Sequence, residues 1–248
     1  MPERSGRLAR EGGHEIAWRL REGRGPTLVW FGGTRSDMTA TKASALDRWA
    51  AQTGRALLRF DYFGHGASTG RFEAGTIGRW RADGLAAVDA AVEGPLVLVG
   101  SSMGGWIASL VAAARPERTV GLVLVAPAPD YTDKLVEPAM SDADRRALAR
   151  DGAFSDAVEG ETYTRTFLED GRRWSLLPGP APITAPVRIL QGGADTVVPF
   201  HHALAFADSL PGPDVVFTLV RDGDHRLSRP QDLARLIQAV EEVCGRAG

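Results

Sequence analysis

The sequence predicts an α/β protein in which helices cover a mostly parallel sheet. Short apolar, β-branched runs alternate with longer helical patterns along the 248 residues. Several of these runs are almost continuously apolar, which is typical of strands buried on both faces of a parallel sheet. An eight-fold barrel of similar length is the alternative. However, the chain opens with two strand patterns and no helix between them, which favours an open sheet that starts with a hairpin.

Seven runs are the expected strands, and five helical patterns lie between them. The strands are expected at 15–20, 27–31, 56–60, 95–100, 120–126, 187–191 and 215–220. The helices are expected at 39–53, 78–92, 103–114, 200–210 and 230–243.

The alternation stops between about residues 130 and 180, where a polar helical stretch and scattered large apolar residues replace the strand pattern. A long insertion with its own apolar residues is typical of a lid over a site, although a helical excursion packed on the core fits the same pattern. We expect a single domain over 1–248, with residues 131–180 forming a lid within it.

Composition and charge exclude several classes of function. The hydrophobic content of 44% and charged content of 24% are ordinary for a globular protein. A net charge of −2 offers no attraction for nucleic acid or an anionic membrane. No run approaches the ~18 apolar residues of a membrane-spanning helix, and the N-terminal residues lack a secretory signal pattern. One cysteine, Cys244, excludes an internal disulfide. We therefore expect a cytoplasmic protein.

Residues 100–105 read "GSSMGG", directly after an expected strand and before an expected helix. The spacing Gly-x-Ser-x-Gly selects Ser102, with Gly100 and Gly104 two residues to either side. A serine nucleophile must project from the sheet edge on a sharp strand-to-helix turn, where larger neighbours would collide. The pattern predicts that Ser102 is a nucleophile, and Ser101 a structural hydroxyl that ends the strand.

A serine hydroxyl needs a base, usually histidine, and a carboxylate that orients the base. Of the five histidines, His225 lies in a loop between the last strand and the last helix, at an edge where open α/β sheets place their sites. The remaining four are less suitable candidates: His14, His65, His201 and His202.

Asp195 is the preferred acid, because it follows the strand expected at 187–191. The resulting order along the chain, Ser102, Asp195 and then His225, is a known order for a serine triad on an α/β sheet. Asp130, which follows the preceding strand, is its main rival. Asp222 and Asp224 lie too close to His225 in sequence to be preferred.

An oxyanion hole requires backbone N–H groups near the nucleophile. Met103, immediately after Ser102, is one expected donor. The second is expected in the glycine-rich turn after the strand at 27–31, where Gly33 is the first choice and Thr34 the second.

With these residues identified, the sequence resembles the α/β-hydrolase superfamily over essentially its whole length. The segments "SDMTATKA", "RFDYFGHGASTGRFEAGTIGRW", "LVGSSMGGW" and "RDGDHRLSRPQDL" resemble a narrower group of acyl-protein thioesterases and acyl-glucuronide esterases with bacterial relatives. The resemblance implies a mostly parallel sheet and hydrolysis of esters or thioesters through Ser102, Asp195 and His225. It also implies a structural role for the loop that holds His65. Phe31-Gly32 stands where the superfamily often has His-Gly.

The sequence thus predicts a serine hydrolase that forms an acyl-enzyme on Ser102 and needs no metal or organic cofactor. Acyl transfer by the same residues, with an alcohol or amine outcompeting water, is a second hypothesis. A ligand receptor with this fold and little turnover is a third. The apolar residues Tyr163, Phe167 and Trp174 of the insertion suggest an apolar acyl site, or equally a packed core.

Overall fold

The computed structural model describes residues 2–156, 160–177, 179 and 181–246. Eight strands of this part of the chain form one sheet in the order β1-β2-β4-β3-β5-β6-β9-β10. They are β1 (Glu3–Arg10), β2 (His14–Arg21), β3 (Arg24–Phe31), β4 (Arg55–Phe60), β5 (Leu96–Ser101), β6 (Thr119–Val125), β9 (Val187–Gly192) and β10 (Val215–Val220). In this order, the six neighbouring strands β4, β3, β5, β6, β9 and β10 run parallel. Strand β2 is antiparallel to both of its neighbours, β1 and β4.

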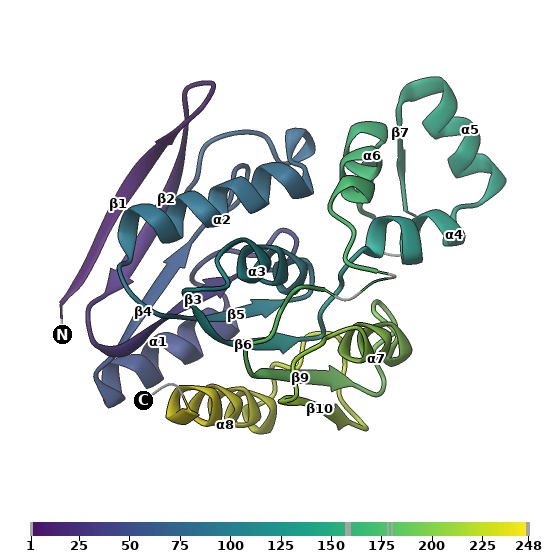
Figure 1. Ribbon diagram of the computed structural model, residues 1–248. Helices are drawn as coiled ribbons and strands as arrows, with labels where there is room; N and C mark the ends of the chain where they lie inside the picture. Colours follow the sequence, from purple (N-terminus) through teal and green to yellow (C-terminus); the bar gives the residue numbers. More distant parts are fainter. Residues whose placement is uncertain (1, 157–159, 178, 180, 247–248) are drawn as a thin grey trace.

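The helices that follow the strands divide between the two faces of the sheet (Figure 1). They are α1 (Thr41–Thr53), α2 (Ile77–Ala91), α3 (Met103–Ala114), α7 (Phe200–Asp208) and α8 (Pro230–Arg246), with a short turn η1 (Phe72–Ala74) before α2. Helices α1 and α8 pack on one face, and α2, α3 and α7 pack on the other. The central strands are therefore buried on both faces, which explains their continuously apolar sequences.

The segment between β6 and β9 forms a separate group of small elements beside the sheet (Figure 1). It contains η2 (Thr132–Val136), α4 (Glu137–Ala139), α5 (Asp142–Asp151), β7 (Ala153–Ser155), β8 (Thr162–Thr164) and α6 (Arg165–Arg173). Ser141 and Asp144 form a reciprocal capping box at the start of α5. Phe154, Phe167 and Leu168 are buried and join the core on the α2 side.

The α/β class and all seven expected strands are confirmed, with ends shifted by at most a few residues. Two expectations are wrong. The strands expected at 15–20 and 27–31 do not form the opening hairpin: β1 pairs with β2, and β3 pairs with β4 and β5. The sequence did not predict β1 because this exposed, polar strand has no clear strand pattern. The insertion is not free of strands, since β7 and β8 form a two-stranded sheet. Each of these strands has three residues, which are too few to show an alternating pattern in the sequence.

Candidate active site

The strand-to-helix turn at Ser102 has the strained geometry expected of a nucleophile elbow. Ser102 adopts φ 55° and ψ −124°, between β5 and α3. A Cβ added to Gly100 would lie 2.4 Å from the Gly104 carbonyl oxygen, and one added to Gly104 would lie 2.1 Å from the Phe31 carbonyl oxygen. Glycine is therefore required at both positions by close backbone approach.

Three residues from different loops meet at the C-terminal edge of the sheet. Nε2 of His225 lies 3.0 Å from Oγ of Ser102, and Nδ1 of His225 lies 2.8 Å from Oδ2 of Asp195. With a neutral imidazole protonated at Nδ1, this nitrogen donates to Asp195 and the Ser102 hydroxyl donates to Nε2. The arrangement has the geometry in which imidazole can remove the hydroxyl proton.

The carboxylate of Asp195 is fully buried and held by several donors. Oδ1 accepts from the amides of Val197 at 2.9 Å and Val198 at 2.8 Å, while Oδ2 also accepts from Nε2 of Gln191 at 3.0 Å. Burial alone would raise the pKa of Asp195, but its hydrogen bond and charge interaction with His225 and the backbone donors lower it overall. Asp195 is thus ionised at neutral pH and can orient the imidazole.

The turn after β3 lies against the elbow. A Cβ on Gly33 would lie 3.2 Å from the Ser101 carbonyl oxygen and 3.4 Å from Cβ of Ser102. Met103 is the first residue of α3, so its N–H has no acceptor within the helix. Oγ1 of the neighbouring Thr34 lies 3.7 Å from Sδ of Met103. The backbone of Gly33 and the N-terminus of α3 therefore flank Ser102 from two sides.

A cavity of about 500 Å³ opens over Ser102 and His225. Its lining from the β6–β9 segment is largely apolar or aromatic: Tyr131, Leu135, Val136 and Tyr163. Its lining from α1 and the His225 loop is polar and cationic, and includes Lys42, Arg226 and Ser228. The volume lies within the range of small-molecule sites.

An ion pair joins two residues that line the cavity. Nε of Arg35 lies 2.9 Å from Oε2 of Glu161, joining the loop after β3 to the β6–β9 segment. Arg35 has φ 54° and also stacks over the ring of Phe72. Neither Arg35 nor Glu161 was singled out in the sequence, because a pair 126 positions apart leaves no local pattern.

A narrower, aromatic pocket adjoins this cavity and shares Thr34, Tyr131, Glu161 and Tyr163 with it. Phe167 lines this second pocket together with Phe72 and Trp80. Trp174 lines neither; it packs on Gly78 of α2 and lies under the guanidinium of Arg81. Of the three aromatic residues expected at an acyl site, Tyr163 and Phe167 thus face these pockets.

The rival candidates have other partners. Asp130 is buried, and its carboxylate accepts from the Ser175 hydroxyl and from the amides of Leu176 and Leu177. Burial raises the pKa of Asp130 despite these bonds. It ties the two ends of the β6–β9 segment together, and the hydrogen bonds of His225 go to Asp195 and Ser102 instead. The side chains of Asp222 and Asp224 bind Arg229 and the Leu227 amide, respectively.

The remaining histidines also lie outside the site. His65 is buried among aromatic rings, and its Nδ1 lies 3.1 Å from the Phe63 carbonyl oxygen. Nε2 of His202 lies 2.7 Å from the Pro129 carbonyl oxygen. His14 contacts the ring of Phe63 edge-on, and His201 stacks on Phe200.

Two further observations concern cofactors and membranes. Among the described residues, no group of three or more His, Cys, Asp or Glu side chains is placed to hold a metal ion. Within the same residues, no helix combines the length and apolar character needed to cross a bilayer.

Comparison with known proteins matches residues 28–154 to the family model described as serine aminopeptidase, S33. Palmitoyl-protein thioesterase ABHD10, mitochondrial, from Mus musculus is 34% identical over 235 residues, which cover 92% of this chain and 78% of the relative. The same protein from Homo sapiens is 33% identical over 234 residues, covering 92% and 76%.

Two solved structures are similar over nearly their whole length. A crystal structure from Agrobacterium vitis S4 is 43% identical, with a TM-score of 0.94, and the alignment covers 98% of this chain and 100% of the other. Alpha/beta hydrolase domain-containing protein 10 from mouse is 32% identical, with a TM-score of 0.92 and coverage of 99% and 100%. The chain therefore belongs to the α/β-hydrolase superfamily of serine hydrolases, and it is an enzyme of the esterase and thioesterase class.

Proposed function

We propose that the protein hydrolyses carboxylic esters or thioesters through a Ser102–His225–Asp195 triad and an acyl-enzyme intermediate. The observation that carries the proposal is the continuous chain of contacts from Ser102 through His225 to the buried Asp195. The strained turn at Ser102 supports it, because such a turn exposes the hydroxyl at the end of a buried strand.

The reaction proceeds in two halves. His225 takes the Ser102 proton as Oγ attacks the acyl carbon, and the N–H groups of Met103 and Gly33 stabilise the oxyanion. The imidazolium then protonates the leaving alcohol or thiol as its bond to the acyl carbon breaks. Water next attacks the acyl-enzyme while His225 accepts its proton, and the collapse of this intermediate returns the proton to Ser102.

The acyl group would occupy the part of the cavity formed by the β6–β9 segment. Tyr131, Leu135, Val136 and Tyr163 offer an apolar surface there, which suits an acyl chain. We assign residues 131–180 the role of a lid on the same grounds, since the described part of this segment supplies these side chains and the Arg35–Glu161 contact. The curated relatives are named palmitoyl-protein thioesterases, which supports acyl thioesters as substrates.

The cellular location is a separate question. The sequence suggested a cytoplasmic protein, but the curated relatives carry the word mitochondrial in their names. The cytoplasmic location stays a prediction, and fractionation of cells that express the native protein tests it.

A fluorophosphonate probe tests the nucleophile. We expect it to label the wild-type protein and not Ser102→Ala, while Ser101→Ala, which removes the adjacent hydroxyl, keeps most of the labelling. Hydrolysis of aryl butyrates and butyryl thioesters should fall at least 10³-fold in Ser102→Ala. Labelling that survives in Ser102→Ala would remove Ser102 as the nucleophile. Product analysis with an added alcohol or amine separates hydrolysis from acyl transfer.

A further inference from the structure

The end of the cavity formed by α1 and the His225 loop carries hydrogen-bond donors and cations. Trp30, Thr41, Lys42, Arg226 and Ser228 line it. Glu161, which lines the opposite part of the cavity, is neutralised by Arg35. The α1 end of the cavity thus has positive charge that its own lining does not balance.

The indole N–H of Trp30 is a buried donor that lacks a partner. Trp30 is 1% exposed, and Nε1 has no hydrogen-bond acceptor among the described residues. A Cβ added to Gly32 would lie 3.7 Å from this nitrogen and 3.7 Å from Cβ of Ser36, another residue of the cavity wall. An unpaired buried donor costs about 1–3 kcal/mol. Because this nitrogen is enclosed beside the Gly32 backbone, a ligand in the cavity does not reach it, and Trp30 supplies no donor for binding.

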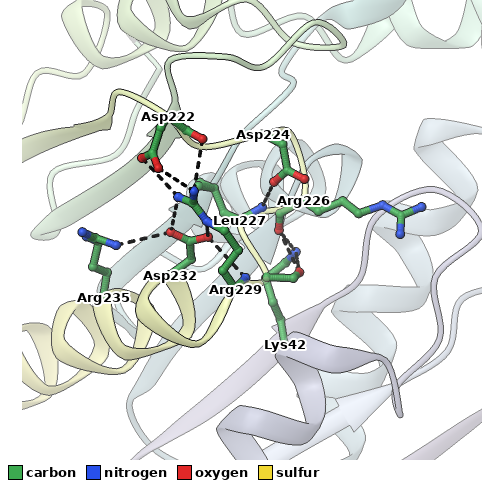
Figure 2. A network of polar contacts seen from close by, with 9 residues as sticks. Lys42, Asp222, Asp224, Arg226, Leu227, Arg229, Asp232 and Arg235 are labelled. Atoms are coloured by element: carbon green, nitrogen blue, oxygen red, sulfur yellow. Dashed lines mark hydrogen bonds and ion pairs between the residues drawn. The ribbon is translucent and has the colours of Figure 1, made fainter.

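Lys42 reaches from α1 to the His225 loop (Figure 2). Its ammonium donates to the Arg226 carbonyl oxygen and lies 3.4 Å from Oγ of Ser228. Burial, together with the nearby Arg226 charge, lowers the pKa of Lys42 to about 8, although Asp224 and Asp232 act in the opposite direction. Lys42 therefore remains mostly charged at pH 7 without a carboxylate in direct contact.

The carboxylates near Lys42 have other partners, as Figure 2 shows. Asp224 accepts from the Leu227 amide at 2.9 Å, and Asp232 binds Arg229 and Arg235. Neither carboxylate lines the cavity. The exposed guanidinium of Arg226 makes no ion pair within the described part of the chain, and it points away from the Asp222–Arg229–Asp232 cluster in Figure 2. Two cations thus meet this end of the cavity, while the surrounding acids are occupied.

The N-terminus of α1 adds partial positive charge, which the Asp37 carboxylate offsets in part because it accepts from the Thr39 amide at 2.6 Å. The helix is 13 residues long, its N-cap Ala40 provides no side-chain acceptor, and its first turn contains no acidic residue. The first amides of a helix have no intrahelical acceptors, and the helix dipole places partial positive charge there. Thr41 and Lys42, the first two residues of α1, both line the cavity.

We propose that the α1 end of the cavity binds an anionic group, a carboxylate or a phosphate, on the leaving portion of the ester or thioester. We place the leaving portion of the substrate at this end because His225 must protonate the leaving atom. This assignment rests on the proposed function. Arg226 and Ser228 belong to the same loop as His225, whereas the apolar surface suited to an acyl chain lies on the β6–β9 segment. Lys42 and Arg226 would then determine the choice of leaving group.

The test compares an anionic thioester with a neutral one of nearly the same shape, and adds a phosphate thioester as a second anion. S-butyryl-3-mercaptopropionate is compared with the neutral S-butyryl-3-mercaptopropionamide, and S-butyryl-2-mercaptoethyl phosphate shows whether phosphate is preferred to carboxylate. At pH 7 we expect kcat/KM to be about 10-fold higher for one or both anionic thioesters than for the amide. This corresponds to one charge-assisted hydrogen bond of about 1.4 kcal/mol.

Two variants examine the site itself. Lys42→Met removes the ammonium, and Arg226→Gln removes an exposed cation. Each should lower the ratio of anionic to neutral kcat/KM at least threefold. A general disturbance of the His225 loop would slow both substrates and leave the ratio unchanged. Lys134→Met is the matched control, since Lys134 is the other lysine of the chain and pairs with Asp133 outside the cavity.

Equal kcat/KM for anionic and neutral thioesters, with hydrolysis still dependent on Ser102, would overturn the anion site and leave the proposed function standing. A wild-type preference that survives in both variants would also overturn it. Failure to hydrolyse any of the thioesters, or the corresponding aryl butyrates, would remove the proposed function and this inference with it.

Discussion

Ser102 holds a backbone conformation that non-glycine residues rarely adopt, at a cost of about 1–3 kcal/mol. Its amide donates to the Val125 carbonyl oxygen at 2.9 Å, and its carbonyl accepts from the Gly105 amide at 2.8 Å. These bonds and the buried helix that follows hold the turn in place. The strain is therefore supported by neighbouring elements, and the hydroxyl remains free to approach His225.

Replacing Asp195 tests the residue proposed to orient the base. We expect Asp195→Asn to lower kcat by about 10⁴-fold, because an amide favours the wrong imidazole tautomer. Asp130→Asn is the matched control, because Asp130 also follows a strand at the C-terminal edge of the sheet. This variant should lower kcat far less. Ester hydrolysis measured under saturating substrate gives both numbers, and similar losses in the two variants would contradict the assignment of Asp195.

The pH dependence of stability provides a second measurement on the same variant. The folded protein lowers the pKa of Asp195, so the ionised carboxylate stabilises the fold above the pKa of an unfolded aspartate, about 3.9. That contribution is lost as pH falls through the lower, folded-state pKa. Urea unfolding should therefore show Asp195→Asn less stable than wild type at pH 7, with the difference narrowing toward pH 3. A difference that is constant with pH would contradict this expectation.

At the scale of elements, the site depends on how closely α3 approaches the end of β3. Gly104 lies in the first turn of α3, where an added Cβ would lie 2.1 Å from the Phe31 carbonyl oxygen and 2.3 Å from that of Gly32. Both contacts are with backbone, which cannot rotate away as a side chain can. The glycine thus sets the distance between Ser102 and the turn that holds Gly33.

We expect Gly104→Ala to separate these elements. It should destabilise the fold by about 1–3 kcal/mol through overpacking, and reduce kcat by about 10²-fold because one oxyanion donor moves out of position. Gly245→Ala in α8, where an added Cβ meets nothing within 4 Å, is the matched control. It should leave kcat unchanged and should not lower stability, because alanine favours a helix over glycine by up to about 1 kcal/mol. Urea unfolding and ester hydrolysis provide the measurements. Wild-type activity in Gly104→Ala would show that the close approach is not required.

At the scale of the whole molecule, two apolar cores lie on opposite faces of the sheet, and the central strands belong to both. The first strand, β1, pairs only with β2, and its residues are exposed or half-buried. By contrast, every residue of β5 and β9 is buried. Local stability should therefore decrease from the centre of the sheet toward the β1–β2 hairpin.

Hydrogen exchange of the native protein tests this gradient. Amides of β1 and of the short β7–β8 pair should exchange by local opening, well before those of β5, β6 and β9, which should require global unfolding. Protection measured by mass spectrometry on peptides from each strand checks the order. Equal protection in β1 and β5 would contradict a peripheral hairpin.

Local patterns determined most of the architecture. Apolar runs predicted the parallel strands, and the helix at 103–114 matches α3 at both ends. The same patterns could not predict strand pairing, because β1 is too polar to show a period, and β7 and β8 are too short.

For the site, the sequence by itself selected Ser102, because the glycine spacing follows from the geometry of one turn. It favoured Asp195 as the acid and left Asp130 as a rival, since both follow strands that end at the same edge of the sheet. Only the tertiary structure brings Asp195 to His225 and turns Asp130 toward Ser175 and Leu176. Lys42 and Glu161 were not anticipated for the same physical reason: contacts between residues more than a hundred positions apart depend on how the elements pack.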